Sequence, residues 1–174
     1  MTFKYLPEKA QQAILYIADA LPEQENMYKV LKVIYFADKE HLFKFGRFIF
    51  GESYTAMQHG PVPSNSYDLV KKIRLHHTTY PETKEDGALF TVTVENTIIP
   101  MVKPDLSSFS KSDLECLNNA IEKLRPLTFR QVRELSHDEA YEKAGANDFI
   151  TVDSIVEMAP NRDDLKEHLS ARHE

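Results

Sequence analysis

Hydrophobic residues recur every three or four positions through most of this chain, which is the spacing typical of amphipathic helices. The first predicted helix stops at Pro22. It buries a stripe formed by Ala10, Ala13, Ile14, Ile17, Ala18 and Leu21. A second helix is predicted over residues 27–45, because Gly46 suits the left-handed conformation that often follows a helix. Further helices are expected over residues 64–75 and 111–124.

A shorter part of the chain has the two-residue period of a β-strand. Residues 90–94 alternate apolar side chains with threonines, and residues 98–102 are placed to return beside them as the partner in an antiparallel hairpin. Pro100 cannot donate a backbone hydrogen bond, so this partner is expected at a sheet edge. The aromatic segment over residues 48–57 is also predicted to be extended.

The C-terminal region is predicted to be a run of short helices. Three residue pairs have the spacing of a helix capping box: Thr128 with Gln131, Ser136 with Glu139 and, in a weaker form, Asn161 with Asp164. A helical tail is expected over residues 161–174, and loops over residues 77–88 and 103–110. The pattern as a whole predicts a single compact α+β domain over residues 1–174, mainly α-helical, with about six or seven helices and a small antiparallel β-hairpin.

The composition fits one ordinary core. With 174 residues and 42% hydrophobic content, the chain can bury roughly 70% of the surface that it exposes when unfolded. The net charge of −6 argues against a general affinity for nucleic acid, which needs a positive field. The densest basic group is formed by Lys71, Lys72, Arg74, His76 and His77. A solvated helix face explains this group better than a nucleic-acid site, and a regulator that binds nucleic acid through residues 71–77 is the weaker alternative.

Three features predict a cytoplasmic protein. Cys116 is the only cysteine, so no disulfide can form within the chain, and we expect it to be a small packing residue. The N-terminus lacks the cationic and apolar segments of a secretory leader. No apolar run approaches the roughly 18 to 20 residues that a membrane-spanning helix needs.

The predicted helix over residues 27–45 carries an acid and an imidazole on the side meant for packing. At about 100° per residue, Asp38 and His41 fall on its apolar stripe. The other members of this stripe are Met27, Leu31, Ile34 and Phe45. The first interpretation is a buried network in which Asp38 accepts from amides or hydroxyls of residues 54–60, because an unpaired buried carboxylate is costly. The others are catalysis or metal binding by the two residues, and direct contact with a partner.

A catalytic set or a metal site would need more groups than this pair. The other histidines are candidates in number only, because no second ligand motif accompanies them: His59, His76, His77 and His137. The consecutive Ser136, His137 and Asp138 do not suit a catalytic triad, because neighbours at a helix start point in different directions. The five glycines are too dispersed for a phosphate-binding loop. We predict no catalytic residue, metal or cofactor; the alternative is a small acid–base or metal-dependent hydrolase centred on Asp38 and His41.

The segment from Gly60 to Pro63 is predicted to be a rigid turn. Gly60 can take a positive φ and the two prolines fix their φ at about −65°, so the segment leads into the following helix at a set angle. A stiff turn also loses little entropy on docking. Apolar and aromatic neighbours can anchor a protein partner there: Phe48, Phe50, Tyr54 and Met57. The structural and the binding interpretations are compatible.

Five short motifs combine in one pattern along the chain. They are Phe36-Ala37-Asp38 with His41, Gly46-Arg47, Tyr54-Thr55-Ala56, Gly60-Pro61-Val62 and, expected to begin a late helix, Ser136-His137. In these motifs, and over nearly its whole length, the chain resembles the SocA-like or Panacea antitoxin domain, which also occurs in phage-associated proteins called GepA. Tyr141 stands in the late helix where this family often has a tryptophan.

The resemblance implies an antitoxin that neutralises a toxin by binding it. Members are encoded beside diverse toxins, and one kind acts as an adapter that delivers its toxin to a cytosolic AAA+ protease. The implied partners are therefore a cognate toxin protein and, for an adapter, such a protease. Neither a membrane nor direct contact with nucleic acid is expected. The residues implied to form a structural or partner-binding motif are Asp38, His41, Arg47, Tyr54, Gly60, Pro61, Val62 and His137.

Overall fold

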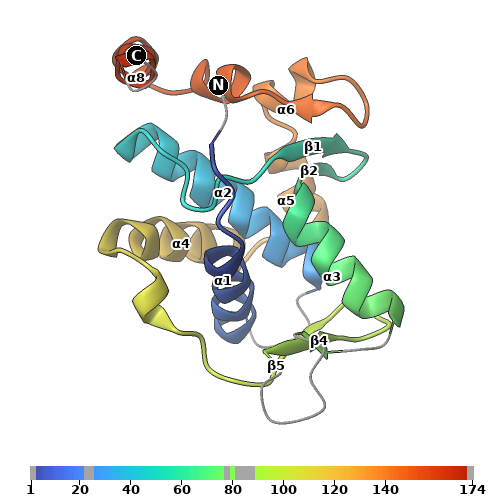
Figure 1. Cartoon of the computed structure of the whole chain (residues 1–174). Coiled ribbons are helices and arrows are strands. Elements are labelled where there is room, and N and C mark those ends of the chain that lie inside the picture. The colour runs from blue at the N-terminus through green and yellow to red at the C-terminus, as the bar shows by residue number, and fades with distance from the viewer. Residues whose placement is uncertain (1–2, 22–25, 77–78, 81–88, 172–174) are drawn as a thin grey trace.

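The computed structural model describes residues 3–21, 26–76, 79–80 and 89–171 (Figure 1). Its helices are α1 (Pro7–Ala20), α2 (Met27–Phe45), α3 (Ser64–His76), α4 (Lys111–Leu124), α5 (Phe129–Ser136), α6 (Glu139–Lys143), α7 (Val152–Val156) and α8 (Arg162–Ala171). Its strands are β1 (Tyr54–Met57), β2 (Gly60–Pro63), β3 (Thr79–Tyr80), β4 (Phe90–Val92), β5 (Ile98–Pro100) and β6 (Phe149–Ile150). The predicted α+β class, mainly helical, is confirmed. The predictions for Pro22, His77, the loop over residues 77–88 apart from residues 79–80, and the end of the tail, residues 172–174, lie outside the described residues.

Helix α2 forms the centre of the fold. It packs against α1, α4 and β2, and it is buried around most of its circumference because apolar residues surround it. The side chain of Asn26 accepts hydrogen bonds from the amides of Tyr28 and Lys29 and so caps the first turn. Gly46 follows the last residue with a φ of 65°, which confirms the predicted C-terminal cap.

The segment predicted to be a rigid turn is a strand. Residues 60–63 form β2, which pairs antiparallel with β1 in a hairpin whose turn is residues 58–59. The prediction was wrong because Pro61 and Pro63 have no amide to donate and such residues are rare inside sheets. β2 tolerates them as an edge strand, since the sheet order is β2-β1-β6. Within the segment predicted to be extended, only the part from Tyr54 onward is a strand.

The predicted β-hairpin is confirmed in a second sheet. β4 and β5 pair antiparallel with Val92 opposite Ile98, and Pro100 lies in an edge strand as expected. β3 pairs with the other side of β4, so residues 79–80 form a strand within a segment predicted to be a loop. The other predicted loop contains a short 3-10 helix at Leu106–Ser108. Both were missed because two or three residues are too few to show a period.

The C-terminal helices follow the prediction with one correction. The capping box predicted at the start of α5 is confirmed, and α8 begins where it was expected. Ser136, predicted to cap a helix together with Glu139, is instead the last residue of α5, because its hydroxyl donates to the carbonyl oxygen of Arg133 at 2.9 Å. Asp138 caps α6, where its carboxylate accepts from the amide of Tyr141 at 3.1 Å. The Ser-His pair therefore ends one helix rather than beginning another.

The two sheets lie at opposite ends of the molecule. Figure 1 shows α6 and α8 at the end that holds β1 and β2, whereas β4 and β5 lie at the other end. The second sheet packs on α1 and α3, and the first packs on α2, α3 and α5. Within the described residues, no helix has both the length and the apolar character needed to cross a membrane.

Candidate functional site

Asp38 is fully buried on α2 and accepts three hydrogen bonds. Its Oδ1 accepts from the backbone amides of Ile49 at 2.6 Å and Phe50 at 3.1 Å, and its Oδ2 accepts from the hydroxyl of Tyr54 at 2.7 Å. The network predicted for Asp38 is present, but only Tyr54 belongs to the segment that was expected to supply the donors. Asp38 therefore ties α2 to the loop before β1 as well as to β1 itself.

The environment of Asp38 changes its acidity. Burial raises its pKa to about 7, while hydrogen bonds from Tyr54, Phe50 and Ile49 act in the opposite direction. Glu52 lies near enough to raise the pKa of Asp38 further, and burial raises the pKa of Glu52 as well. Glu52 accepts from the amides at the start of α3, so two buried carboxylates hold the segment around β1.

His41 belongs to a different network from Asp38. Its Nδ1 lies 2.9 Å from the carbonyl oxygen of Arg47, so this nitrogen carries a proton and donates. Its Nε2 lies 3.0 Å from the hydroxyl of Ser112 and 3.2 Å from Oδ1 of Asp113, both on α4. The two polar residues of the α2 stripe thus share a helix face but contact different parts of the fold.

Asp113 is a buried hub that sequence reasoning missed. Besides His41, its carboxylate accepts from Lys9 Nζ at 2.7 Å, from Arg47 Nη2 at 2.9 Å and from the amide of Ser110 at 2.9 Å. Burial alone would raise its pKa, but the hydrogen bonds from His41 and Lys9 hold the pKa well below its usual range. The available signal was the Ser110-x-x-Asp113 spacing, which is a capping box and is present at the start of α4.

These networks and the β1–β2 hairpin lie inside a region that matches a known family, except for Lys9. Residues 30–142 match the antitoxin SocA-like, Panacea domain. The chain belongs to this family. The match extends from α2 into α6, so it includes the Asp38 network and, apart from Lys9, the Asp113 network. No curated protein and no solved structure matches the chain significantly.

The Gly60-Pro61-Val62 motif of the Panacea domain faces the interior. Lys32 Nζ donates to the carbonyl oxygen of Pro61 at 2.6 Å, which ties α2 to β2. Gly60 has a φ of 95°, and a Cβ at this position would lie 2.4 Å from Ser136 Oγ. Val62 is also buried. Glycine is therefore required both by the backbone conformation and by the close approach of α5.

His137 and Tyr141 contact the same hairpin. The two rings stack with their centroids 4.1 Å apart, and the hydroxyl of Tyr141 donates to the carbonyl oxygen of Met57 at 3.0 Å. Tyr141 thus contacts the end of β1. Burial lowers the pKa of His137, and Arg133 acts in the same direction. Among the described residues, Nε2 of His137 has no hydrogen-bond partner although it is buried.

Asp138 is a second junction that sequence reasoning missed. Its Oδ2 accepts from the hydroxyl of Tyr35 at 2.8 Å and from Lys39 Nζ at 2.6 Å, while its Oδ1 caps α6. Asp138 therefore fastens α6 to the central helix of the Panacea domain. The preference of aspartate for the residue before a helix was the signal that could have found it.

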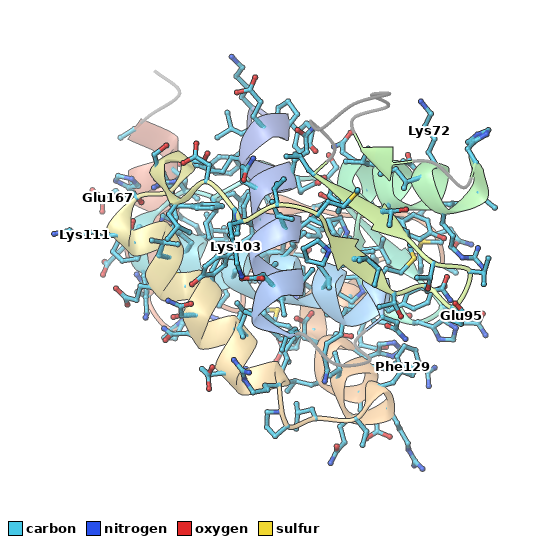
Figure 2. The ribbon with its side chains drawn as sticks, turned by 90° about the horizontal axis from the view of Figure 1, so that it is seen from below. Lys72, Glu95, Lys103, Lys111, Phe129 and Glu167 are labelled. Atoms are coloured by element: carbon cyan, nitrogen blue, oxygen red, sulfur yellow. The ribbon has the colours of Figure 1, made fainter. Side chains whose placement is uncertain are left out.

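An aromatic cluster lies at the surface beside the hairpin. It consists of Tyr28, His59 and Phe129 and is called the aromatic cluster below. Their ring centroids are 5.6 to 6.4 Å apart. Phe129 is 45% exposed, and Figure 2 shows it at the start of α5, close to α2. Sequence reasoning missed the cluster because its three residues come from three separate elements.

The remaining sequence candidates lie apart from these networks. Within the described part of the chain, no three His, Cys, Asp or Glu side chains are grouped so that they could hold a metal ion. Cys116 is fully buried on α4, and burial raises its pKa to about 12, which agrees with a packing residue.

The basic group predicted on α3 lies at the surface. Lys71 and Lys72 are exposed there, where Figure 2 labels Lys72, and Arg74 donates to the carbonyl oxygen of Val94 at 3.2 Å.

Proposed function

We propose that this protein is the antitoxin of a cytoplasmic toxin–antitoxin system and that it neutralises its cognate toxin by direct binding. The observation that carries the proposal is the match of residues 30–142 to the antitoxin SocA-like, Panacea domain. Binding of this kind depends on a stable surface with a few buried anchors rather than on a converging catalytic set. The contacts of the family motif residues favour a binding surface over a catalytic set.

We assign the family motif residues a structural role in this function. Asp38 and Tyr54 bond to each other in the interior, His41 and Arg47 bond to buried Asp113, and the Gly-Pro-Val motif is buried against α2 and α5. Groups that are buried and already hydrogen-bonded stabilise the fold and are not available to contact a partner. Contact with the toxin then falls to the exposed residues around the hairpin and to side chains there that keep unused hydrogen-bond donors.

A hydrolase centred on Asp38 and His41 receives less support from the same geometry. The polar atoms of Asp38 are bonded to the segment before and within β1, and those of His41 point to Arg47 and α4. A general base must instead lie within reach of a nucleophile or a substrate proton. Elemental analysis of the purified protein tests this alternative: a stoichiometric transition metal that is lost in His41→Ala would favour it.

Co-expression with the neighbouring open reading frame tests the proposed function. We expect that gene to inhibit growth when it is expressed alone, and we expect this chain to restore growth and to copurify with its product. Rescue and copurification should both survive in Glu115→Ala, an exposed acid of α4, which serves as a control for surface mutation. Failure of the wild-type chain in both assays would refute the proposal.

Toxin lifetime separates two modes of neutralisation, occlusion and delivery to a protease. We propose adapter delivery to a cytosolic AAA+ protease as the finer form of the function. It is expected to shorten the half-life of the toxin after translation is stopped, and only in cells that contain the protease. A toxin that is neutralised but equally long-lived in both strains would leave occlusion as the mode.

A further inference from the structure

Two adjoining hollows lie beside the β1–β2 hairpin. The larger hollow has a volume of about 130 Å³ and includes the apolar side chains of Leu31 and Val62 in its wall, whereas the smaller has a volume of about 30 Å³. Both are lined by Tyr28, Lys32 and His59. An engineered apolar cavity of about 150 Å³ in another protein binds benzene. The larger hollow therefore has the size for one aliphatic or aromatic side chain.

The charge around the two hollows is opposite to that of the whole chain. The net charge of the protein is −6, yet the residues that line the hollows include Lys29, Lys32 and Arg133. None of the described residues that line either hollow is acidic. Asp138, the acid whose charge acts on Lys32, is already bonded to two groups of α2 and to the first turn of α6.

Lys32 is one of the residues that line both hollows. It is only 4% exposed, and the carbonyl oxygen of Pro61 takes one of the three donor positions of the ammonium at 2.6 Å. Burial lowers the pKa of Lys32 to about 7, while Asp138 acts in the opposite direction. A buried cation is costly until a carboxylate pairs with it, so an incoming acid would be stabilised here.

We propose that the two hollows are the toxin-recognition site and that they take an acidic side chain of the toxin, whose carboxylate pairs with Lys32 while a neighbouring apolar side chain fills the larger hollow. This inference rests on the proposed antitoxin function. The local positive charge selects an acidic segment, and the volume selects a single apolar side chain beside it. The aromatic cluster, with the exposed ring of Phe129, forms a rim that excludes water from such a pair.

The first test measures the dissociation constant for the toxin by calorimetry. Lys32→Met keeps an unbranched side chain and removes the ammonium, and we expect it to weaken binding by about 10-fold or more at pH 7. Lys111→Met, on α4, makes the same change of charge and is the control. Figure 2 shows Lys111 on the opposite side of the molecule from Phe129, so this change should leave the dissociation constant within about two-fold of the wild type. Val62→Phe fills the larger hollow without a change of charge and should also weaken binding.

The second test needs no toxin. The blocked peptides Ac-Leu-Glu-Leu-NH2 and Ac-Leu-Gln-Leu-NH2 differ only in one carboxylate, and their binding can be followed by the ring proton signals of His59 and His137. The glutamate peptide is expected to shift these signals at concentrations about five-fold lower than the glutamine peptide. The difference should disappear in Lys32→Met. A third peptide, Ac-Leu-Gln-Leu with a free C-terminus, asks whether a terminal carboxylate is the preferred group.

The outcomes separate the inference from the proposed function. Equal binding of the toxin by wild type, Lys32→Met and Val62→Phe would overturn the inference and leave the antitoxin function standing. Equal shifts with the two blocked peptides, or shifts with the free-terminus peptide alone, would also overturn it. A wild-type chain that neither binds nor neutralises the toxin would refute the function, and the peptides would still decide what the hollows bind. Circular dichroism confirms that each variant is folded.

Discussion

The hydroxyl of Tyr54 on β1 donates a 2.7 Å hydrogen bond to the buried carboxylate of Asp38 on α2. The same carboxylate accepts from two backbone amides ahead of β1, so one side chain joins the central helix to the hairpin and to its approach. Asp113 joins α4 to α1 and to the loop after α2 in the same manner. Two buried acids thus fix the frame on which the hairpin and its hollows rest.

Removal of the Asp38 carboxylate should destabilise the protein. Asp38→Ala leaves the amides of Ile49 and Phe50 and the Tyr54 hydroxyl without their acceptor, and we expect a loss of about 1–3 kcal/mol in the free energy of unfolding. Asp38→Asn should cost less, because its amide oxygen can still accept from both backbone amides. Urea denaturation at pH 7 compares the two. Equal losses in both variants would show that the amide bonds contribute little.

Asp38 should also make stability depend on pH. Its pKa is raised by burial to about 7, against about 3.9 in an unfolded chain. The folded state therefore holds this proton more tightly, so the contribution to stability is full below about pH 4 and is lost as pH rises through 7. The free energy of unfolding of the wild type should fall relative to that of Asp38→Asn between pH 5 and 8. Burial lowers the pKa of Lys32 to about 7, so Lys32 makes stability rise with pH above 7. Lys32 is present in both proteins, so its contribution cancels when the wild type is compared with Asp38→Asn.

Loss of Asp113 should destabilise the protein more than loss of Asp38. Asp113→Ala leaves the cationic groups of Lys9 and Arg47 without their buried partner, and breaking such a pair typically costs about 3–5 kcal/mol. Glu115→Ala, on the same helix, breaks an exposed pair with Lys44 and should cost about 1 kcal/mol or less. Thermal unfolding of the two variants gives the comparison. A similar shift in both would mean that burial does not strengthen the Asp113 contacts.

The sequence was sufficient to predict what local periodicity controls. The bounds of α2, its cap at Gly46 and the burial of Asp38 all follow from one apolar stripe and one glycine. The donors to Asp38 were harder to predict, because Ile49 and Phe50 donate through the backbone and any residue would offer the same group. Side-chain identity carries no information about such a bond.

The Asp113 hub could not be predicted from periodicity, because its partners are distant in sequence. Lys9 and Arg47 lie 104 and 66 positions from Asp113, and nothing local to them indicates a shared acceptor. Proximity on α2 instead suggested that Asp38 and His41 act as a couple, and the structure separates them. The strand β2 was missed for a different reason. Proline is acceptable in an edge strand, but the sequence alone does not show that β2 lies at the edge of its sheet.

Gly60 should tolerate no side chain. Gly60→Ala places a Cβ at a φ of 95° and 2.4 Å from Ser136 Oγ, so we expect a loss of about 1–3 kcal/mol and a hairpin displaced from α5. Gly145→Ala is the matched control, because its Cβ would also approach an oxygen at 2.4 Å, but this oxygen belongs to the exposed side chain of Asp148, which can rotate away. Adding Ser136→Ala should recover the part of the loss that comes from the collision and leave the part due to the backbone. Since the hairpin forms one wall of the hollows, Gly60→Ala should also weaken toxin binding. Unchanged stability in this variant would show that neither the collision with Ser136 nor the positive φ is costly.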